Sequence, residues 1–300
     1  MSRVAARCIR PNRPVLLIVG CGDVGLRVLR LLQGRWRVLA LTSSPQRMAT
    51  LREAGAVPLV GNLDEPATLA RLAGLATHVL HLAPPPGSGD TDPRTAHLLQ
   101  ALAQRSGPNS LVYASTSGVY GDCGGAWLDE TRATAPVTAR GWRRVDAERR
   151  VRWAGRAFGW RVSVLRVPGI YALDREGGDP RERVRKGTPV LRPEDDVYTN
   201  HIHADDLARA CVAALLRGAP QRVYHASDDT ELRMGDYFDA VADRFGLARP
   251  PRISREEARQ QLPAISYSFL SESRRLRNRR LKQELRVTLR HPTVADGWVA

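Results

Sequence analysis

Residues 15–25 read VLLIVGCGDVG, a short apolar run that passes directly into three closely spaced glycines. The run from Val15 to Val19 is typical of a strand that is buried on both faces of a parallel sheet. The apolar residues after the glycines, from Val24 to Leu32, are spaced for a helix with a broad buried face. The stretch therefore predicts a strand, a tight turn and a helix, in that order.

The glycines of this turn follow the pattern GxGxxG, which binds a dinucleotide when it lies between a strand and a helix. Gly20 permits the tight turn, Gly22 leaves the backbone open to a diphosphate, and Gly25 lets the helix pack closely on the strand. The first helical residues, Asp23 and Val24, add unpaired N–H groups and the positive end of the helix dipole. We therefore expect NAD(P) to bind at these five residues.

The residues after the second expected strand bear on the choice between NAD and NADP. Proteins that select NAD usually carry an acidic side chain there, which binds the ribose hydroxyls. This sequence has Thr42, Ser43 and Ser44 instead, with Arg47 close behind. Small hydroxyls and an arginine tolerate a 2′-phosphate, so the sequence slightly favours NADP, with Ser43 and Arg47 as contacts. In the alternative interpretation, Arg47 is only a surface residue of the next helix.

Strand and helix patterns alternate, with short loops, through about residue 167. Such alternation predicts α/β architecture, a Rossmann-type doubly wound parallel sheet with helices on both faces. We expect this nucleotide-binding domain over residues 14–167, with 200–226 returning to it, and a smaller C-terminal substrate lobe from 168–199 and 227–300. The expected strands are 15–19, 36–42, 57–60, 77–83, 111–115, 161–167 and 222–226, and the expected helices are 24–32, 45–54, 65–75, 93–104, 138–158, 205–216 and 234–245.

Composition favours a folded chain but leaves its charge open to two interpretations. Of the 300 residues, 43% are hydrophobic, which is enough for a sizeable core. The net charge of +15 comes almost wholly from arginine, since Lys186 and Lys282 are the only lysines. We expect the densest arginine run, 274–280, to form one solvated helix face. We therefore favour a small-molecule partner over nucleic acid, which would bind with an affinity that falls steeply with salt.

The cysteines and the N-terminal segment indicate a cytoplasmic protein. Cys8, Cys21, Cys123 and Cys211 lie far apart without CxxC spacing, which predicts free thiols rather than disulfides or a zinc site. The basic segment before Pro14 lacks the apolar stretch of a signal peptide. Charges interrupt the apolar residues from 15 to 32, so we expect no membrane span.

Beyond the glycine turn, five segments resemble, in the same order, those of extended short-chain dehydrogenases/reductases of the NAD-dependent epimerase/dehydratase group. The most distinctive of them resembles the family's strand-five motif, which bears a serine and a threonine. The resemblance covers about residues 14–245 and implies the family's fold, an NAD(P) cofactor and hydride chemistry on a small molecule. The segments are Gly61–Asp64, His81–Ala83, Tyr113–Asp122, Leu165–Tyr171 and His201–Ala208.

The resemblance also implies roles for single residues near the cofactor. Asn62 and Leu63 would border the adenine. Leu82 and Ala83 would lie beneath the cofactor, at the end of the fourth strand. Ser115 would contact the cofactor or cap the backbone.

One departure from the family affects the proton donor. The family uses a tyrosine four residues before a lysine, and no YxxxK occurs in this sequence. Aligning Ala147-Glu148 with the family's Ala-Glu places Arg140 at the tyrosine position and Arg144 at the lysine position. An arginine cannot lose a proton near neutral pH, so neither works as an acid or a base. Arg144 could still hold the nicotinamide ribose through its charge and its hydrogen bonds.

Few other residues are candidates for chemistry. Thr116 matches the family's substrate-orienting hydroxyl, although it could instead close a local turn. Tyr120 is the best remaining proton donor, although a tyrosine there more often packs structurally. His201 and His203 resemble a metal pair, but without a third ligand at useful spacing we expect a structural role and no metal.

Two function classes remain open. The first is an atypical reductase, epimerase or dehydratase that moves hydride to or from NAD(P), favoured by the retained Ser115, Thr116 and Ser117. The second is a non-catalytic dinucleotide binder that acts as a redox sensor or scaffold, favoured by the missing tyrosine. We prefer the enzyme, with an unknown substrate. The basic chain is compatible with an anionic substrate, and a homodimer is also open.

Overall fold

A parallel sheet of seven strands forms the centre of the structure, a computed structural model that describes residues 13–299. The strand order is β12-β7-β5-β4-β1-β2-β3, and every neighbouring pair in the sheet is parallel. The chain builds outward from β1 to β3 and then crosses back to β4 on the other side of β1, which opens a crevice at the carboxyl ends of β1 and β4. The expected doubly wound α/β fold is confirmed. The strands are β1 (Val15–Val19), β2 (Arg37–Thr42), β3 (Val57–Val60), β4 (His78–His81), β5 (Ser110–Thr116), β7 (Arg161–Val167) and β12 (Arg222–His225).

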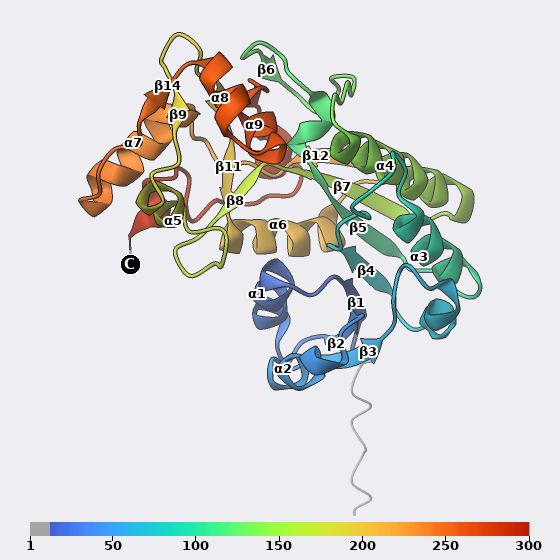
Figure 1. The fold of residues 1–300 in the computed structure, drawn as a ribbon. Coiled ribbons are helices and arrows are strands. Elements are labelled where there is room, and N and C mark those ends of the chain that lie inside the picture. The colour runs from blue at the N-terminus through green and yellow to red at the C-terminus, as the bar shows by residue number, and fades with distance from the viewer. Residues whose placement is uncertain (1–12, 300) are drawn as a thin grey trace, which may run out of the picture.

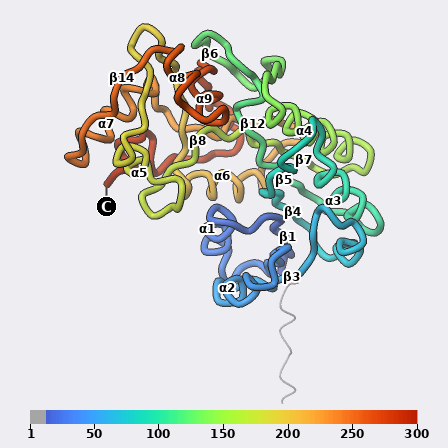
Figure 2. The backbone as a smooth tube through the Cα atoms, viewed as in Figure 1, coloured from blue at the N-terminus to red at the C-terminus, as the bar shows by residue number. Residues whose placement is uncertain are grey.

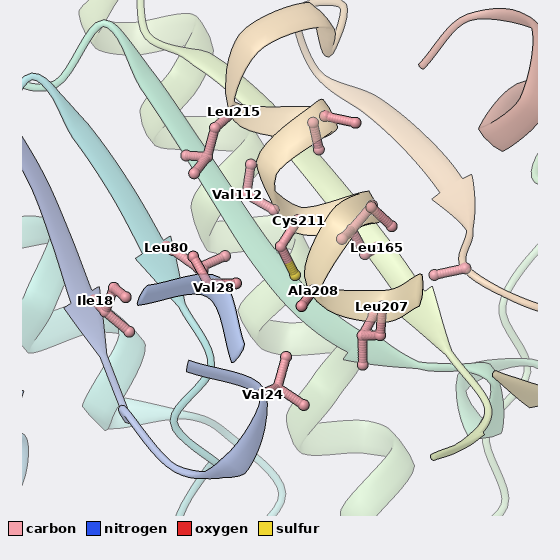
Figure 3. Packing of buried hydrophobic residues seen from close by; sticks show 14 of the residues in the cluster. Ile18, Val24, Val28, Leu80, Val112, Leu165, Leu207, Ala208, Cys211 and Leu215 are labelled. Carbon is pink, nitrogen blue, oxygen red and sulfur yellow. The ribbon is translucent and has the colours of Figure 1, made fainter. Parts of the chain in front are cut away.

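Helices cover both faces of this sheet (Figure 1). Helices α1 (Asp23–Leu32) and α6 (Ala204–Arg217) pack on one face, where Figure 3 shows Val28 beside Leu80 and Cys211 near Val112. Helices α3 (Pro93–Ala103) and α4 (Ala139–Phe158) cover the other face. Alternate strand residues point to opposite faces, so β1, which is covered on both sides, is apolar throughout, as the sequence predicted.

The ends of α4 are well defined, and this matters because the helix carries Arg140 and Arg144. The Thr138 hydroxyl caps the N-terminus by accepting a hydrogen bond from the Gly141 N–H at 3.1 Å. Gly159 ends the helix with a φ of +70°, which favours glycine. The helix is therefore fixed in register above β5.

A third apolar cluster lies away from the sheet. We propose that this cluster is the core of the smaller lobe. It joins Tyr171, Val190, Phe238 and Trp298 across segments far apart in sequence. In Figure 2 the yellow and orange parts of the chain gather on one side of the sheet, while α6 returns to it. The remaining strands are short: β6 (Trp127–Leu128), β8 (Gly169–Tyr171), β9 (Val190–Leu191), β10 (Tyr198–Thr199), β11 (His201–His203), β13 (Leu232–Arg233), β14 (Arg252–Ile253) and β15 (Arg275–Leu276). The remaining helices are α2 (Met48–Glu53), which lies beside β3, α5 (Pro180–Arg185), α7 (Met234–Phe245), α8 (Arg255–Gln261), α9 (Ala264–Leu270) and α10 (Arg279–Gln283). Short 3-10 helices lie at Pro45–Arg47, Pro66–Leu72, Ser117–Tyr120 and Asp296–Trp298.

Residues 65–75, expected to be helical, contain the 3-10 helix Pro66–Leu72.

One local expectation was wrong. The arginine run 274–280 is not one helix face, because β15 (Arg275–Leu276) pairs with β6 and the following helix begins only at Arg279. The Arg275 guanidinium instead stacks 5.0 Å above the Trp127 ring and 4.5 Å above the Tyr198 ring. These arginines are structural contacts rather than a continuous basic face.

Two further features bear on the sequence predictions. In residues 13–299, no helix combines the length and the apolar character that crossing a bilayer requires. Cys21, Cys123 and Cys211 are free thiols, as predicted. Cys8 and most of the basic N-terminal segment lie outside the described residues.

Candidate functional site

The glycine turn has the geometry that its pattern predicts. Gly20 has a φ of +83°, and a Cβ there would lie 2.5 Å from the backbone nitrogen of Ala83. A Cβ on Gly25 would lie 3.0 Å from the Cys21 Sγ, so the helix packs closely on the turn. A Cβ on Gly22 would meet nothing within 4 Å. The turn therefore leaves open space at the N-terminus of α1, and a diphosphate fits there.

A cavity of about 390 Å³ lies beside this turn, at the ends of β1, β2 and β3. The wall of this cavity contains Gly20 and five further contacts that the sequence predicted. Leu82 is not among them, because it packs against the core between the sheet and α6. The five are Ser43, Arg47, Asn62, Leu63 and Ala83.

Arg47 reaches from the 3-10 turn after β2 back to the glycine turn. Its Nη2 donates a hydrogen bond to the carbonyl oxygen of Cys21 at 2.7 Å. The guanidinium therefore spans the cavity wall between the turn and Ser43, rather than pointing away as a surface residue. This placement suits a cation that faces the ribose of a bound dinucleotide.

Arg94 is a cavity residue that the sequence did not single out. Its Nε and Nη2 donate to the two carboxylate oxygens of Asp64 at 2.8 and 2.6 Å. This pairing lowers the pKa of Asp64. The bidentate pair ties α3 to the turn after β3 and closes one side of the cavity.

A second cavity, of about 590 Å³, lies where the carboxyl ends of β5 and β7 meet the proposed lobe. Thr116, Arg140 and Arg144 all line it, so the structure brings three of the four predicted catalytic residues together. Arg144 donates to the hydroxyl of Tyr113 at 3.0 Å and to the carbonyl oxygen of Ala114 at 2.8 Å. These bonds hold its guanidinium against the end of β5.

Tyr120, the fourth predicted catalytic residue, lies beneath the cavity and is only 1% exposed. Its hydroxyl lies 2.5 Å from the Nε2 of His225 and accepts a hydrogen bond from Arg166 at 2.7 Å. Burial raises the pKa of Tyr120 to about 12. With both contacts made inside the protein, we do not retain Tyr120 as a proton donor to a substrate.

Ser115 belongs to the same buried network. Its hydroxyl donates to the Glu148 carboxylate at 2.6 Å, and Glu148 also forms an ion pair with Arg166 at 2.7 Å. The network joins β5, α4 and β7 directly beneath Arg144. The geometry therefore favours a structural role for the Ser115 hydroxyl, which binds Glu148, over a contact with the cofactor.

Sequence reasoning also missed Glu272, which lines the second cavity. Its side chain is 7% exposed, and one carboxylate oxygen accepts a hydrogen bond from Arg274 at 2.8 Å. That oxygen lies 4.0 Å from the point where a Cβ on Gly118 would be, and the Thr116 hydroxyl lies 3.6 Å from the same point. A carboxylate and a hydroxyl thus share one end of the cavity. No motif marks Glu272, which lies in an irregular segment between α9 and β15.

The opposite wall carries an arginine without a counter-charge. The Nε and Nη2 of Arg183 are buried and have no hydrogen-bond partner within residues 13–299. The guanidinium lies 4.7 Å from the centre of the Phe238 ring, and burial lowers the pKa of Arg183. Since buried donors are almost always paired, this arginine is suited to an anion that enters the cavity.

Comparison with known proteins agrees with the observed fold. The NAD dependent epimerase/dehydratase family matches residues 16–226 of this sequence. The chain belongs to this family.

The relatives of this chain differ in the fraction of their length that the match covers. A functionally unknown conserved protein from Silicibacter pomeroyi is 32% identical, with a TM-score of 0.78 and coverage of 95% of this chain and 96% of that one. UDP-glucose 4-epimerase from Azospirillum brasilense is 29% identical over 150 residues, which is 41% of this chain. The match spans 42% of the length of that curated relative.

Two solved structures share the fold at lower identity. MoeE5, in complex with UDP-glucose and NAD, is 20% identical, with a TM-score of 0.75 over 94% of this chain and 95% of that one. UDP-glucose 4-epimerase from Thermotoga maritima, with UDP-glucose, is 17% identical, with a TM-score of 0.77 over 94% of this chain and 96% of that one.

Arg140 is the residue that the motif comparison with the family placed at the proton-donor position. Its guanidinium lies 4.5 Å from the centre of the Phe269 ring, and burial lowers its pKa, while the nearby Glu272 opposes that shift. An arginine keeps its proton even so, and it cannot act as an acid in place of a tyrosine.

The two histidines of the segment His201–Ala208 have separate environments. His201 is buried and stacks on Tyr237, with 4.1 Å between ring centroids. Burial lowers the pKa of His201 to about 3, so the ring is neutral. His203 lies close to Asp205 and His291, two neighbours that no local spacing revealed.

Proposed function

We propose that the protein is an NAD(P)-dependent oxidoreductase or epimerase that acts on a hydroxyl or carbonyl carbon of a small anionic substrate. The observation that carries this proposal is the second cavity, where Thr116 and Glu272 share one end and the unpaired Arg183 lies in the wall. A scaffold protein has no need of a buried carboxylate and an arginine with unpartnered buried nitrogens in the walls of one cavity. Such groups are costly to bury and gather at functional sites.

The chain's residues divide the work of the reaction. A nicotinamide cofactor at the glycine turn would accept or supply the hydride. Thr116 donates a hydrogen bond to the substrate oxygen. Glu272 accepts the hydroxyl proton when an alcohol is oxidised, and returns a proton to the oxygen when a carbonyl is reduced. Arg140 stabilises negative charge on that oxygen, and Arg144 holds the nicotinamide ribose.

The substrate would carry an anionic group at the end opposite its reacting carbon. Arg140, Arg144, Arg183 and Arg274 line the cavity together with Glu272. A phosphate or carboxylate on the substrate would neutralise Arg183, which forms no ion pair with the described residues 13–299. Because two structural relatives are complexes with UDP-glucose, sugar nucleotides are the first class of substrate to test.

The competing function is a non-catalytic NAD(P) sensor, which the absence of YxxxK favours. Cofactor labelled with deuterium at its transferable position separates the two. We expect label to move into a compound from a panel of sugar nucleotides and carbonyl compounds. A protein that binds the cofactor but transfers no label to any of them would be a sensor.

Replacing Arg47 by alanine is expected to weaken NADPH binding by about tenfold or more, since a charge-assisted hydrogen bond contributes roughly 1.5–3 kcal/mol. NADH binding should change much less, because NADH lacks the 2′-phosphate. Cofactor fluorescence titrations measure both affinities. Arg52→Ala, an exposed change on the neighbouring α2, is the matched control. Equal losses for NADH and NADPH would remove the preference for NADP.

Replacing Arg183 by methionine should have opposite effects on ligand binding and on stability. Without ligand, the variant should gain about 1–3 kcal/mol in free energy of unfolding, because it no longer buries unpaired donors. Its affinity for inorganic pyrophosphate should fall at least tenfold. Denaturant unfolding and calorimetry measure the two effects, with the exposed Arg185→Met as the control. Loss of stability with unchanged pyrophosphate binding would assign Arg183 to packing alone.

A further inference from the structure

Three side chains with metal-binding atoms meet outside both cavities, where the C-terminal segment crosses the start of α6. His203 ends β11 and caps α6, Asp205 lies in the first turn of that helix, and His291 comes from the C-terminal segment. One ligand atom from each lies within 4.8 Å of the other two. The two imidazole rings are 3.8 Å apart between centroids.

The backbone fixes this meeting point. The Asp206 carboxylate is fully buried and accepts hydrogen bonds from the backbone N–H groups of Arg290 at 2.9 Å and His291 at 2.8 Å. The C-terminal segment is therefore anchored to α6 whether or not an ion is bound. The side chains of His291 and Asp205 are only partly buried and can turn toward a common point.

The two histidines differ in whether a nitrogen lone pair is free. The Nδ1 of His291 lies 3.2 Å from the carbonyl oxygen of Asp296, which can only accept, so Nδ1 carries the proton and Nε2 is free to bind. Histidines that bind metal ions commonly donate their other N–H to a carbonyl in this way. The Nδ1 of His203 faces Asp205 and accepts a 3.2 Å hydrogen bond from the Asp205 N–H, so an ion bound at this nitrogen would replace that hydrogen bond.

The local charge tolerates a cation even though the buried Arg27 is nearby. Arg27 contacts one oxygen of Asp205 at 2.6 Å and also pairs with Asp174 and Asp23. Arg175 shares Asp23, so three carboxylates face two guanidinium groups. The other oxygen of Asp205 lies 4.0 Å from the Nδ1 of His203, on the side of the histidines.

We propose that His203, Asp205 and His291 bind a divalent transition-metal ion of the zinc class. Two imidazole nitrogens and a carboxylate oxygen form a ligand set that Zn²⁺ accepts, with water in the fourth position. Ligand atoms about 2.0–2.2 Å from a tetrahedral ion lie roughly 3.3–3.6 Å apart, so the three groups need to draw together by about 1 Å. The ion would clamp the C-terminal segment to α6. The proposal does not depend on the proposed enzymatic function.

Titration of the full-length protein with Co²⁺ tests this site, because tetrahedral Co²⁺ gives strong visible absorption. The titration uses a Cys8→Ser/Cys123→Ser background, which removes the thiol of the partly exposed Cys123 and that of Cys8, which lies outside the described residues. We expect one Co²⁺ per chain, displaced by Zn²⁺. His291→Gln should weaken binding at least tenfold, and it keeps the backbone hydrogen bond to Asp206. His97→Gln, a change to a partly exposed histidine on α3, should leave binding unchanged.

A second variant removes a different ligand. Asp205→Asn can keep the Arg27 contact through its amide oxygen but loses the anionic ligand, so its Co²⁺ affinity should also fall at least tenfold. Two results would overturn the site. One is the absence of Co²⁺ uptake at millimolar concentration, and the other is an unchanged affinity in both ligand variants.

Discussion

Replacing Gly22 by valine is expected to abolish NADPH binding while leaving the fold intact. The side chain would occupy the open space at the N-terminus of α1, where a Cβ meets no protein atom within 4 Å. Gly22 has a φ of −85°, which lies outside the left-handed region that disfavours side chains. Loss of two charge-assisted hydrogen bonds to the diphosphate would weaken binding by about 100-fold or more. Fluorescence titration measures the loss, and thermal unfolding checks the fold.

The choice of position makes this variant informative. Gly20→Val would fail for a different reason, because its φ of +83° and its contact with Ala83 exclude a side chain from the folded protein. Gly87→Val is the matched control, since a Cβ there also meets nothing within 4 Å and Gly87 lines neither cavity. NADPH affinity retained in Gly22→Val would mean that the diphosphate does not bind at this turn.

Replacing Glu272 by glutamine is expected to lower the rate of hydride transfer by about 10²–10⁴-fold, the range that general acid–base groups supply. The amide can still accept the hydrogen bond from Arg274, so the cavity should keep its shape. The affinity for NADPH should be unchanged, because Glu272 lines the second cavity and not the cavity beside the glycine turn. Single-turnover transfer from labelled cofactor, with the substrate identified in the panel, measures the rate.

Two controls sharpen this result. Glu256→Gln, an exposed change on α8, should keep the wild-type rate. Glu272→Asp keeps a carboxylate and should recover part of the rate. A Glu272→Gln variant as fast as the wild type would require another proton-transfer group, and the remaining candidate would be a water held by Thr116.

The sequence predicted the sheet and its nucleotide turn well because these depend on local patterns. The strand pattern and the helical spacing of apolar residues gave β7 and α7 with the observed bounds, 161–167 and 234–245. The glycine turn was found because each glycine answers a backbone requirement within one short stretch. The sequence also indicated a helical segment over 65–75, where the structure has the 3-10 helix Pro66–Leu72, and apolar spacing alone does not separate this kind of helix from an α-helix.

The residues that line the second cavity were only partly predictable, because segments far apart in sequence form it. Thr116, Arg140 and Arg144 were found by aligning motifs with the family. Glu272 and Arg183 carry no motif, and only the folded lobe brings them to the ends of β5 and β7. The arginine run 274–280 was misjudged for a related reason, since pairing of β15 with β6 overrides its helical spacing.

A crystal structure with bound NADPH tests the central claim most directly. The account predicts a diphosphate against the backbone of Gly22, a 2′-phosphate beside Arg47, and a nicotinamide C4 that faces Thr116 and Glu272. Density for the dinucleotide elsewhere, or a nicotinamide ring turned away from that end of the second cavity, would contradict it.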